Sequence, residues 1–125
     1  MNTRSETGKL GEDMATGYLI RKGYKIIERN HREKWGEIDI IAKSPDETLV
    51  FFEVKTSKGD NVDKLLVNPE DQMTKAKMIK LKRTAALYVV QLDEEVNQEV
   101  GWRIDLLALT ITPKDCVIKH YQNIS

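Results

Sequence analysis

Cysteine is almost absent from the chain, and no run of apolar residues approaches the length of a membrane span. The single cysteine, Cys116, has no second cysteine with which to form a disulfide, so we expect a reducing, cytoplasmic compartment and no membrane partner. The first residues lack the apolar stretch of a signal peptide, so none is expected. The two histidines, His31 and His120, lie far apart in the sequence, and a zinc site is therefore not expected.

The chain also lacks an excess of either charge. Its 20 Lys and Arg residues balance its 20 Asp and Glu residues, so the formal net charge is zero. Net charge therefore gives no indication of nucleic-acid binding, and such binding would require a local basic patch. A length of 125 residues with 40% hydrophobic residues fits one domain, residues 1–125, with one modest core.

Hydrophobic periodicity and turn residues divide the chain into helices and strands. Helices are predicted at 7–22 and 69–92, and strands at 24–30, 37–42, 48–55, 102–109 and 116–121. Polar loops or connections are predicted at 31–35, 57–68 and 93–99, and the alternative for residues 93–99 is a continuation of the second helix. Thr7 is a candidate cap for the first helix, and Gly23 a candidate stop. The fold class that we expect is α/β, with a mixed central β-sheet flanked by α-helices.

Two charged residues, Glu53 and Lys55, interrupt the strand predicted at 48–55, which is otherwise almost continuously apolar. Side chains alternate along a strand, so both point to the same face. A central strand rarely carries charges unless they are paired or functional. One interpretation is an ion pair at the end of an edge strand, and the other is a functional site.

Asp39 adds a second carboxylate to this face. A turn at 44–47 would pair the two neighbouring strands about Asp46 and place Asp39 opposite Glu53, within a residue of register. Asp39 is expected on the face opposite Ile38 and Ile40. Two neighbouring carboxylates repel each other unless a proton or a cation lies between them. Such oxygen ligands suit Mg²⁺ or Mn²⁺.

Three other groups of charged residues leave two interpretations open. Glu12 lies at the border of the apolar face of the first helix, so it either approaches the sheet or remains a solvated residue on the flank. Arg103 and Asp105 share a strand face and are expected to pair with each other rather than to take part in catalysis. Five basic residues on the second helix could contact phosphates or form a solvated face. They are Lys75, Lys77, Lys80, Lys82 and Arg83.

Several short motifs between about Gly8 and Leu109 together resemble the YraN family of small bacterial and archaeal proteins. That family is assigned to the PD-(D/E)xK nuclease superfamily. The motif that pairs Gly36-Glu37-Ile38-Asp39 with Glu53-Val54-Lys55 is specific in this context. The other matching positions are Gly11-Glu12, Gly23-Tyr24, Glu28-Arg29-Asn30 and Arg103-Ile104-Asp105.

The resemblance implies a restriction-endonuclease-like core similar to archaeal Holliday-junction resolvases. By the motif match, Asp39 and Glu53 would ligate Mg²⁺ or Mn²⁺, Lys55 would serve the attacking water, and Glu12 would be an acid carried by the helix. The function that we expect is hydrolysis of phosphodiester bonds, with DNA, especially branched or structured DNA, as the substrate. Lys75, Lys77, Lys80 and Lys82 are the candidate nucleic-acid contacts, and a homodimer is a possible assembly.

Two rival hypotheses remain open at this stage. One is a nucleic-acid-binding module that keeps the nuclease fold but does not cut. The other is a structural subunit whose charged cluster is a network of ion pairs.

Overall fold

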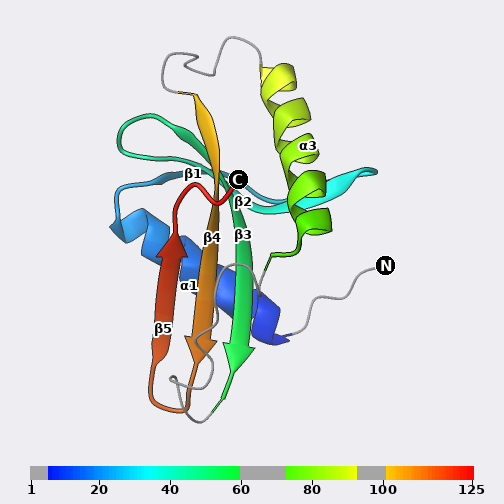
Figure 1. Cartoon of the computed structure of the whole chain (residues 1–125). Coiled ribbons are helices and arrows are strands. Elements are labelled where there is room, and N and C mark those ends of the chain that lie inside the picture. Colours follow the sequence, from blue (N-terminus) through cyan, green and yellow to red (C-terminus); the bar gives the residue numbers. More distant parts are fainter. Residues whose placement is uncertain (1–5, 60–72, 93–100) are drawn as a thin grey trace.

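The computed structural model describes residues 6–59, 73–92 and 101–125 (Figure 1). These residues form two helices and five strands. The helices are α1 (Glu6–Arg21) and α3 (Lys75–Leu92). The strands are β1 (Lys25–Glu33), β2 (Gly36–Lys43), β3 (Leu49–Lys58), β4 (Trp102–Ile111) and β5 (Cys116–Tyr121).

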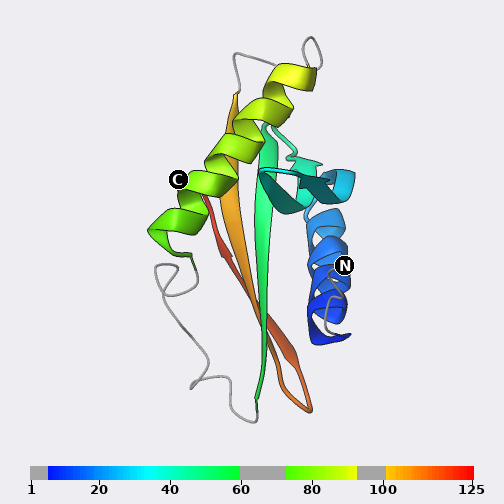
Figure 2. The ribbon, with the colours of Figure 1, turned by 90° about the vertical axis from the view of Figure 1, so that its right-hand side faces the viewer.

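The five strands form one mixed sheet in the order β1-β2-β3-β4-β5. Strand β3 is antiparallel to β2 and parallel to β4, while β1 and β5 pair antiparallel with β2 and β4. Figure 2 shows α1 on one side of the sheet and α3 on the other. The predicted α/β class, with a mixed sheet flanked by helices, is confirmed.

Strand β3 contributes to two apolar clusters, one on each face of the sheet. Phe51 packs on the α3 side, where its ring makes edge contacts with Tyr88 and Trp102. Phe52 packs on the α1 side with Leu19 and other buried residues. Both phenylalanines are 0% exposed, and burial of a side chain of this size contributes about 1.5–3 kcal/mol. The position of β3 in the middle of the sheet therefore follows from its apolar residues on both faces.

The turn between β2 and β3 forms where the sequence predicts it. The Asp46 carboxylate accepts hydrogen bonds from the Ser44 hydroxyl and from the Thr48 backbone N–H, the latter at 3.1 Å. Hydrogen bonds from Ser44, then from Thr48, lower the pKa of Asp46 to about 2. Asp46 thus remains ionised at neutral pH and fixes the centre of the hairpin.

The prediction that Ile38 and Ile40 share the face opposite Asp39 is wrong, because side chains do not alternate regularly at this point of β2. Ile38 packs on the α3 side of the sheet, whereas Ile40 packs on the α1 side. Across from this point, Asn30 of β1 has a φ of 54°, in the left-handed region that Asn tolerates better than most residues. Strand β1 also has an irregularity between Ile26 and Glu28. The two-residue period from which the faces were predicted therefore does not hold across Asp39.

Several predicted boundaries shift. Residues 31–33 belong to β1 rather than to a loop, and β3 continues through Lys58. Helix α1 already includes Thr7, so Thr7 is not its cap, while Gly23 follows the helix with a φ of 89°. Met73 and Thr74 precede α3, and the Thr74 hydroxyl accepts the Lys77 N–H at 3.2 Å. The parts of the predictions at 60–72 and 93–100 lie outside the described residues.

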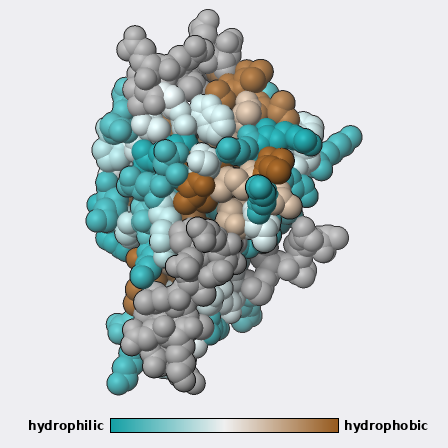
Figure 3. Space-filling view, in the orientation of Figure 1, coloured by the Kyte–Doolittle hydropathy of each residue, from teal (hydrophilic) through white to brown (hydrophobic). Residues whose placement is uncertain are grey.

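The outer face of α3 carries exposed apolar residues among hydrophilic ones, and part of this face is visible in Figure 3. Ile79, Leu87 and Val90 are the large exposed apolar side chains of this helix. Neither α1 nor α3, the helices of the described ranges, is long and apolar enough to cross a membrane.

Helix α1 closely approaches β3 at Gly11. A methyl group at this position would overlap the Thr56 side chain. Because Gly11 precedes Glu12, this close contact also sets how near Glu12 comes to the end of β3.

We expect Gly11→Ala to lower the free energy of unfolding by about 1–3 kcal/mol, since the added methyl group overpacks the contact with Thr56. Urea denaturation measures this change. Gly17→Ala is the matched control, because its methyl group would meet only the flexible end of Arg21, at 3.3 Å. That control should be neutral or stabilising by up to about 1 kcal/mol, given the higher helix propensity of Ala. Equal effects at the two positions would contradict the prediction.

Candidate active site

A pocket of about 280 Å³ lies between the start of α1 and the end of β3. Its lining comes from three elements that are distant in sequence. The lining residues are Gly8, Glu12, Asp39, Glu53, Val54, Lys55 and Thr56. The structure thus brings all four predicted catalytic residues to one pocket.

Asp39 reaches this pocket because the pairing of β2 with β3 ends beside it. The paired residues of β2 and β3 run from Lys43↔Leu49 to Ile40↔Phe52, and one further step would place Asp39 opposite Glu53, as predicted. There, the Asp39 carboxylate accepts the backbone N–H of Val54 at 2.7 Å. The Asp39 side chain therefore accepts a backbone hydrogen bond from β3 at the point where the two strands separate.

Glu53 and Lys55 form an ion pair, with 3.3 Å between Oε1 and Nζ. Their side chains are 19% and 29% exposed. The ion pair of the simpler interpretation is therefore present, but β3 is the third of five strands and not an edge strand. The pair lies where the strand emerges from its apolar core into the pocket.

A second lysine approaches from α3. Burial lowers the pKa of Lys55, but a hydrogen-bonded contact with Lys77 and the charges of Glu53 and Asp39 outweigh it, so the pKa is raised. The same contact and the charge of Lys55 lower the pKa of Lys77. Two lysine side chains and two carboxylates thus interact within one small volume, where the charged form is favoured on Lys55 and disfavoured on Lys77.

Glu12 is 0% exposed, so the interpretation as a solvated flank residue is wrong. Its Oε1 accepts hydrogen bonds from Arg29 Nε at 3.1 Å and from Asn30 Nδ2 at 2.9 Å. Arg29 also pairs with Asp13 at 2.6 Å. The helical wheel could not show this burial, because the compensating groups come from β1.

The oxygen donors fit a hard divalent cation. In residues 6–59, 73–92 and 101–125, no three His, Cys, Asp or Glu side chains gather closely enough to hold a metal by themselves. Mg²⁺, however, is commonly bound by one or two carboxylates together with substrate phosphate and water. Asp39 and Glu53 supply two such carboxylates at one pocket.

The structure separates the four lysines that were predicted to contact nucleic acid. Lys77 and Lys80 line a second pocket, of about 200 Å³, which also contacts Glu53. Lys75 and Lys82 are exposed on α3 and line neither this pocket nor the first. The helix therefore presents two of its lysines towards the site and two elsewhere.

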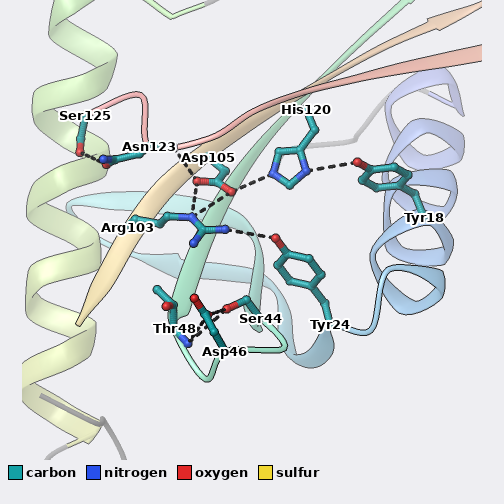
Figure 4. Close-up of polar contacts among 10 residues, drawn as sticks. All are labelled: Tyr18, Tyr24, Ser44, Asp46, Thr48, Arg103, Asp105, His120, Asn123 and Ser125. Carbon is teal, nitrogen blue, oxygen red and sulfur yellow. Dashed lines mark hydrogen bonds and ion pairs between the residues drawn. The ribbon is translucent and has the colours of Figure 1, made fainter. Parts of the chain in front are cut away.

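The predicted pairing of Arg103 with Asp105 is confirmed at 3.0 Å, within a larger polar network (Figure 4). Asp105 is 0% exposed, and His120 Nε2 lies 2.8 Å from its Oδ2. Beyond it, the Tyr18 hydroxyl lies 3.2 Å from His120 Nδ1. Arg103 also donates to the Tyr24 hydroxyl at 3.1 Å. The sequence did not indicate His120 or either tyrosine as members of this network, although a buried aspartate in an apolar strand requires such partners.

Residues 11–109 match the model of "Uncharacterised protein family UPF0102". A UPF0102 protein of Syntrophus aciditrophicus is 38% identical over 121 residues, which cover 95% of this chain and 87% of that protein. A UPF0102 protein of Thermodesulfovibrio yellowstonii is 40% identical over 120 residues, which cover 96% of each chain.

Two solved structures are similar at low scores. A repair endonuclease from Pyrococcus abyssi aligns with a TM-score of 0.41 and 22% identity, over 90% of this chain and 41% of that one. Pyrococcus furiosus SfsA, in a complex with Ca²⁺, aligns with a TM-score of 0.37 and 18% identity, over 93% and 62%. The chain therefore spans less than two thirds of either protein. At these scores, the likenesses indicate neither a site nor an activity for this chain.

Asp105 gives the fold a testable dependence on pH. Burial raises its pKa, but hydrogen bonds from His120, the Asn123 N–H and Arg103 outweigh burial, and the pKa lies below its ordinary value of 3.8. The ionised Asp105 carboxylate therefore stabilises the fold above pH 3.8, and this contribution is lost as the pH falls through the lowered pKa.

We expect Asp105→Asn to lower the free energy of unfolding at pH 7 by about 3–5 kcal/mol, because it leaves Arg103 and His120 without their shared carboxylate. The difference from wild type should shrink as the pH is lowered below 3.8. Denaturant unfolding at several pH values measures both effects, with the exposed Asp115→Asn as the control. A difference that stays constant down to pH 2 would show that the Asp105 charge is not responsible.

Proposed function

We propose that this chain, which belongs to the uncharacterised protein family UPF0102, is a metal-dependent nuclease. Family membership confirms the resemblance to the YraN family. The names of the relatives state no activity, so the proposal rests on the site. The observation that carries it is the convergence of Glu12, Asp39, Glu53 and Lys55 on one pocket.

Asp39 and Glu53 would hold Mg²⁺ or Mn²⁺ through their carboxylate oxygens. When bound, such an ion polarises a phosphate and lowers the pKa of a coordinated water. The hydrogen bond from the Val54 N–H restrains the Asp39 carboxylate, so little ordering of this side chain is needed when the site is used. The two carboxylates also neutralise nearby lysine charge while the pocket is without substrate.

Lys55 would orient the attacking water or stabilise the negative charge that develops on the phosphate. Its raised pKa supports the cationic form that this role requires. Glu12 is oriented by Arg29 and Asn30, which leaves it suited to order a water at the α1 side of the pocket. The chain thus offers carboxylates, an ammonium group and a buried acid at one place.

The substrate that we propose is DNA, with branched and other structured forms first to be tested. The non-cutting nucleic-acid-binding module is the alternative, and cleavage assays separate the two. A cytoplasmic location and a homodimer stay predictions.

Metal binding tests the proposed ligands directly. We expect Asp39→Asn to weaken Mn²⁺ binding at least tenfold, or about 1.4 kcal/mol, in a calorimetric titration. Asn keeps an oxygen that can accept the Val54 N–H, so the fold should be retained. Asp115→Asn, which removes the same charge from an exposed turn, is the control. Equal binding by wild type and Asp39→Asn would exclude Asp39 as a ligand.

Cleavage tests the cooperation of the site. On a panel of branched and single-stranded DNAs, Asp39→Asn, Glu53→Gln and Lys55→Ala should each reduce the rate by roughly 10²–10³-fold or more. Double variants should be scarcely slower than single ones, because groups that act together are not additive. Thermal unfolding of each variant controls for lost structure.

Two outcomes of this assay would overturn the mechanism. They are cleavage that survives in Glu53→Gln and cleavage that needs no divalent ion. Binding of the panel by wild type without any cutting would favour the non-cutting module.

A further inference from the structure

We propose that the second pocket, on the α3 side of Glu53, binds one unpaired nucleotide of the scissile strand. This inference rests on the proposed function and names its substrate class as single-stranded or locally unpaired nucleic acid. It assigns a role to a cavity that the catalytic residues alone do not explain.

The second pocket adjoins the candidate active site through a shared residue. Glu53 lines both cavities, so a group in one lies beside a group in the other. The remaining lining of the second pocket comes from the start of β2, from Met73 and from α3. These residues are Gly36, Glu37, Met73, Lys77, Lys80, Leu81 and Thr84. A strand whose phosphate lies beside Lys55 could therefore place its neighbouring nucleotide here.

The size and the lining of the pocket suit a base. Its volume of about 200 Å³ corresponds to roughly seven waters at about 30 Å³ each, which accommodates one ring-shaped group but no duplex. Met73 and Leu81 contribute apolar surface and are only 8% and 5% exposed. Bases bind to single-strand proteins largely through their faces, with little dependence on sequence.

Two lining residues of the pocket, Gly36 and Thr84, are closely packed. A methyl group on Gly36 would overlap the Thr84 side chain, so the start of β2 and the middle of α3 lie directly against each other. The Thr84 hydroxyl donates to the Lys80 carbonyl at 2.9 Å, so it is already used within the helix.

The charges at the rim suit a phosphate. Lys77 and Lys80 are three residues apart on α3 and therefore project from the same side of the helix. Lys77 also contacts Lys55 in the active site. The positive charge of Lys55 disfavours the charged form of Lys77, and an anion between the two side chains would favour it. Lys77 is thus suited to contact the phosphate that links the two pockets, with Lys80 beyond it.

Binding of a mononucleotide tests the pocket without catalysis. The full-length chain, with all divalent ions chelated, is titrated calorimetrically with deoxyadenosine monophosphate and separately with inorganic phosphate. We expect the nucleotide to bind at least tenfold more tightly than inorganic phosphate, because only the nucleotide places a base against Met73 and Leu81.

Single lysine variants locate the binding. Lys77→Gln and Lys80→Gln should each weaken nucleotide binding roughly tenfold, the factor that corresponds to about 1.4 kcal/mol. Lys75→Gln and Lys82→Gln are matched controls that remove the same charge from the same helix outside the pocket, and they should stay within about twofold of wild type. Equal losses at all four positions, or no detectable nucleotide binding, would overturn the proposal.

Fluorescence tests the requirement for an unpaired base. A single-stranded oligonucleotide that carries 2-aminopurine should change its emission on binding, and the change should be lost in Met73→Trp, whose larger side chain would fill the pocket. The same oligonucleotide in a perfect duplex should show no such change. Equal responses from the single strand and the duplex would overturn the proposal. If Met73→Trp does not fold, the lysine variants provide the test of the pocket.

The outcomes for the pocket and for the nuclease are separable. Nucleotide binding that depends on Lys77 and Lys80, without any cleavage of DNA, would support the pocket and overturn the nuclease. Metal-dependent cleavage with no nucleotide binding here would do the reverse.

Discussion

Apolar side chains cover both faces of β3. Their burial restricts where charged residues can occur on this central strand. Phe51 and Phe52 point to opposite sides and are both enclosed by a helix and by neighbouring strands. A charge among them would lie in a medium that solvates it poorly. Glu53 and Lys55 can therefore occur only where the strand leaves its core, which is also where β2 separates from it. The position of the candidate site is in this sense a consequence of the packing.

A chain with no net charge concentrates charge locally in two quite different ways. Around Asp105, three kinds of donor converge on one carboxylate, and the buried charge is balanced by neighbours that are fixed in place. At the active-site pocket, carboxylates and ammonium groups alternate and remain partly exposed. The first arrangement is complete without a ligand and fits a structural role. The second keeps solvent access and suits the binding of ions or phosphates.

The sequence predicted the parts of the fold that depend on local chemistry. The turn at Asp46 is set by its own neighbours, Ser44 and Thr48, and its centre fixes the pairing of β2 with β3. The proximity of Asp39, Glu53 and Lys55 could therefore be predicted from the sequence. Strict alternation did not hold at Ile38 and Ile40, which pack on opposite sides of the sheet.

The missed features depend on contacts between distant elements. Glu12 is buried only because Arg29 and Asn30 extend to it from β1, and the helical wheel contains no information on that strand. His120 joins Asp105 from another strand, and Tyr18 reaches His120 from α1. The second pocket depends on the close packing of α3 against the start of β2. The spacing of apolar residues in the sequence does not predict this packing.

The distortions of β1 have a consequence for the association of chains. In the described part of the sheet, β1 pairs only with β2, so its other side presents backbone groups that a second chain could use. The irregularity after Ile26 and the left-handed Asn30 interrupt the regular spacing of those groups. Charged residues along the strand, such as Arg32, add a solvation penalty to any such pairing. The irregular backbone that carries Arg29 and Asn30 to Glu12 thereby also makes β1 a poor template for aggregation into continuous sheets.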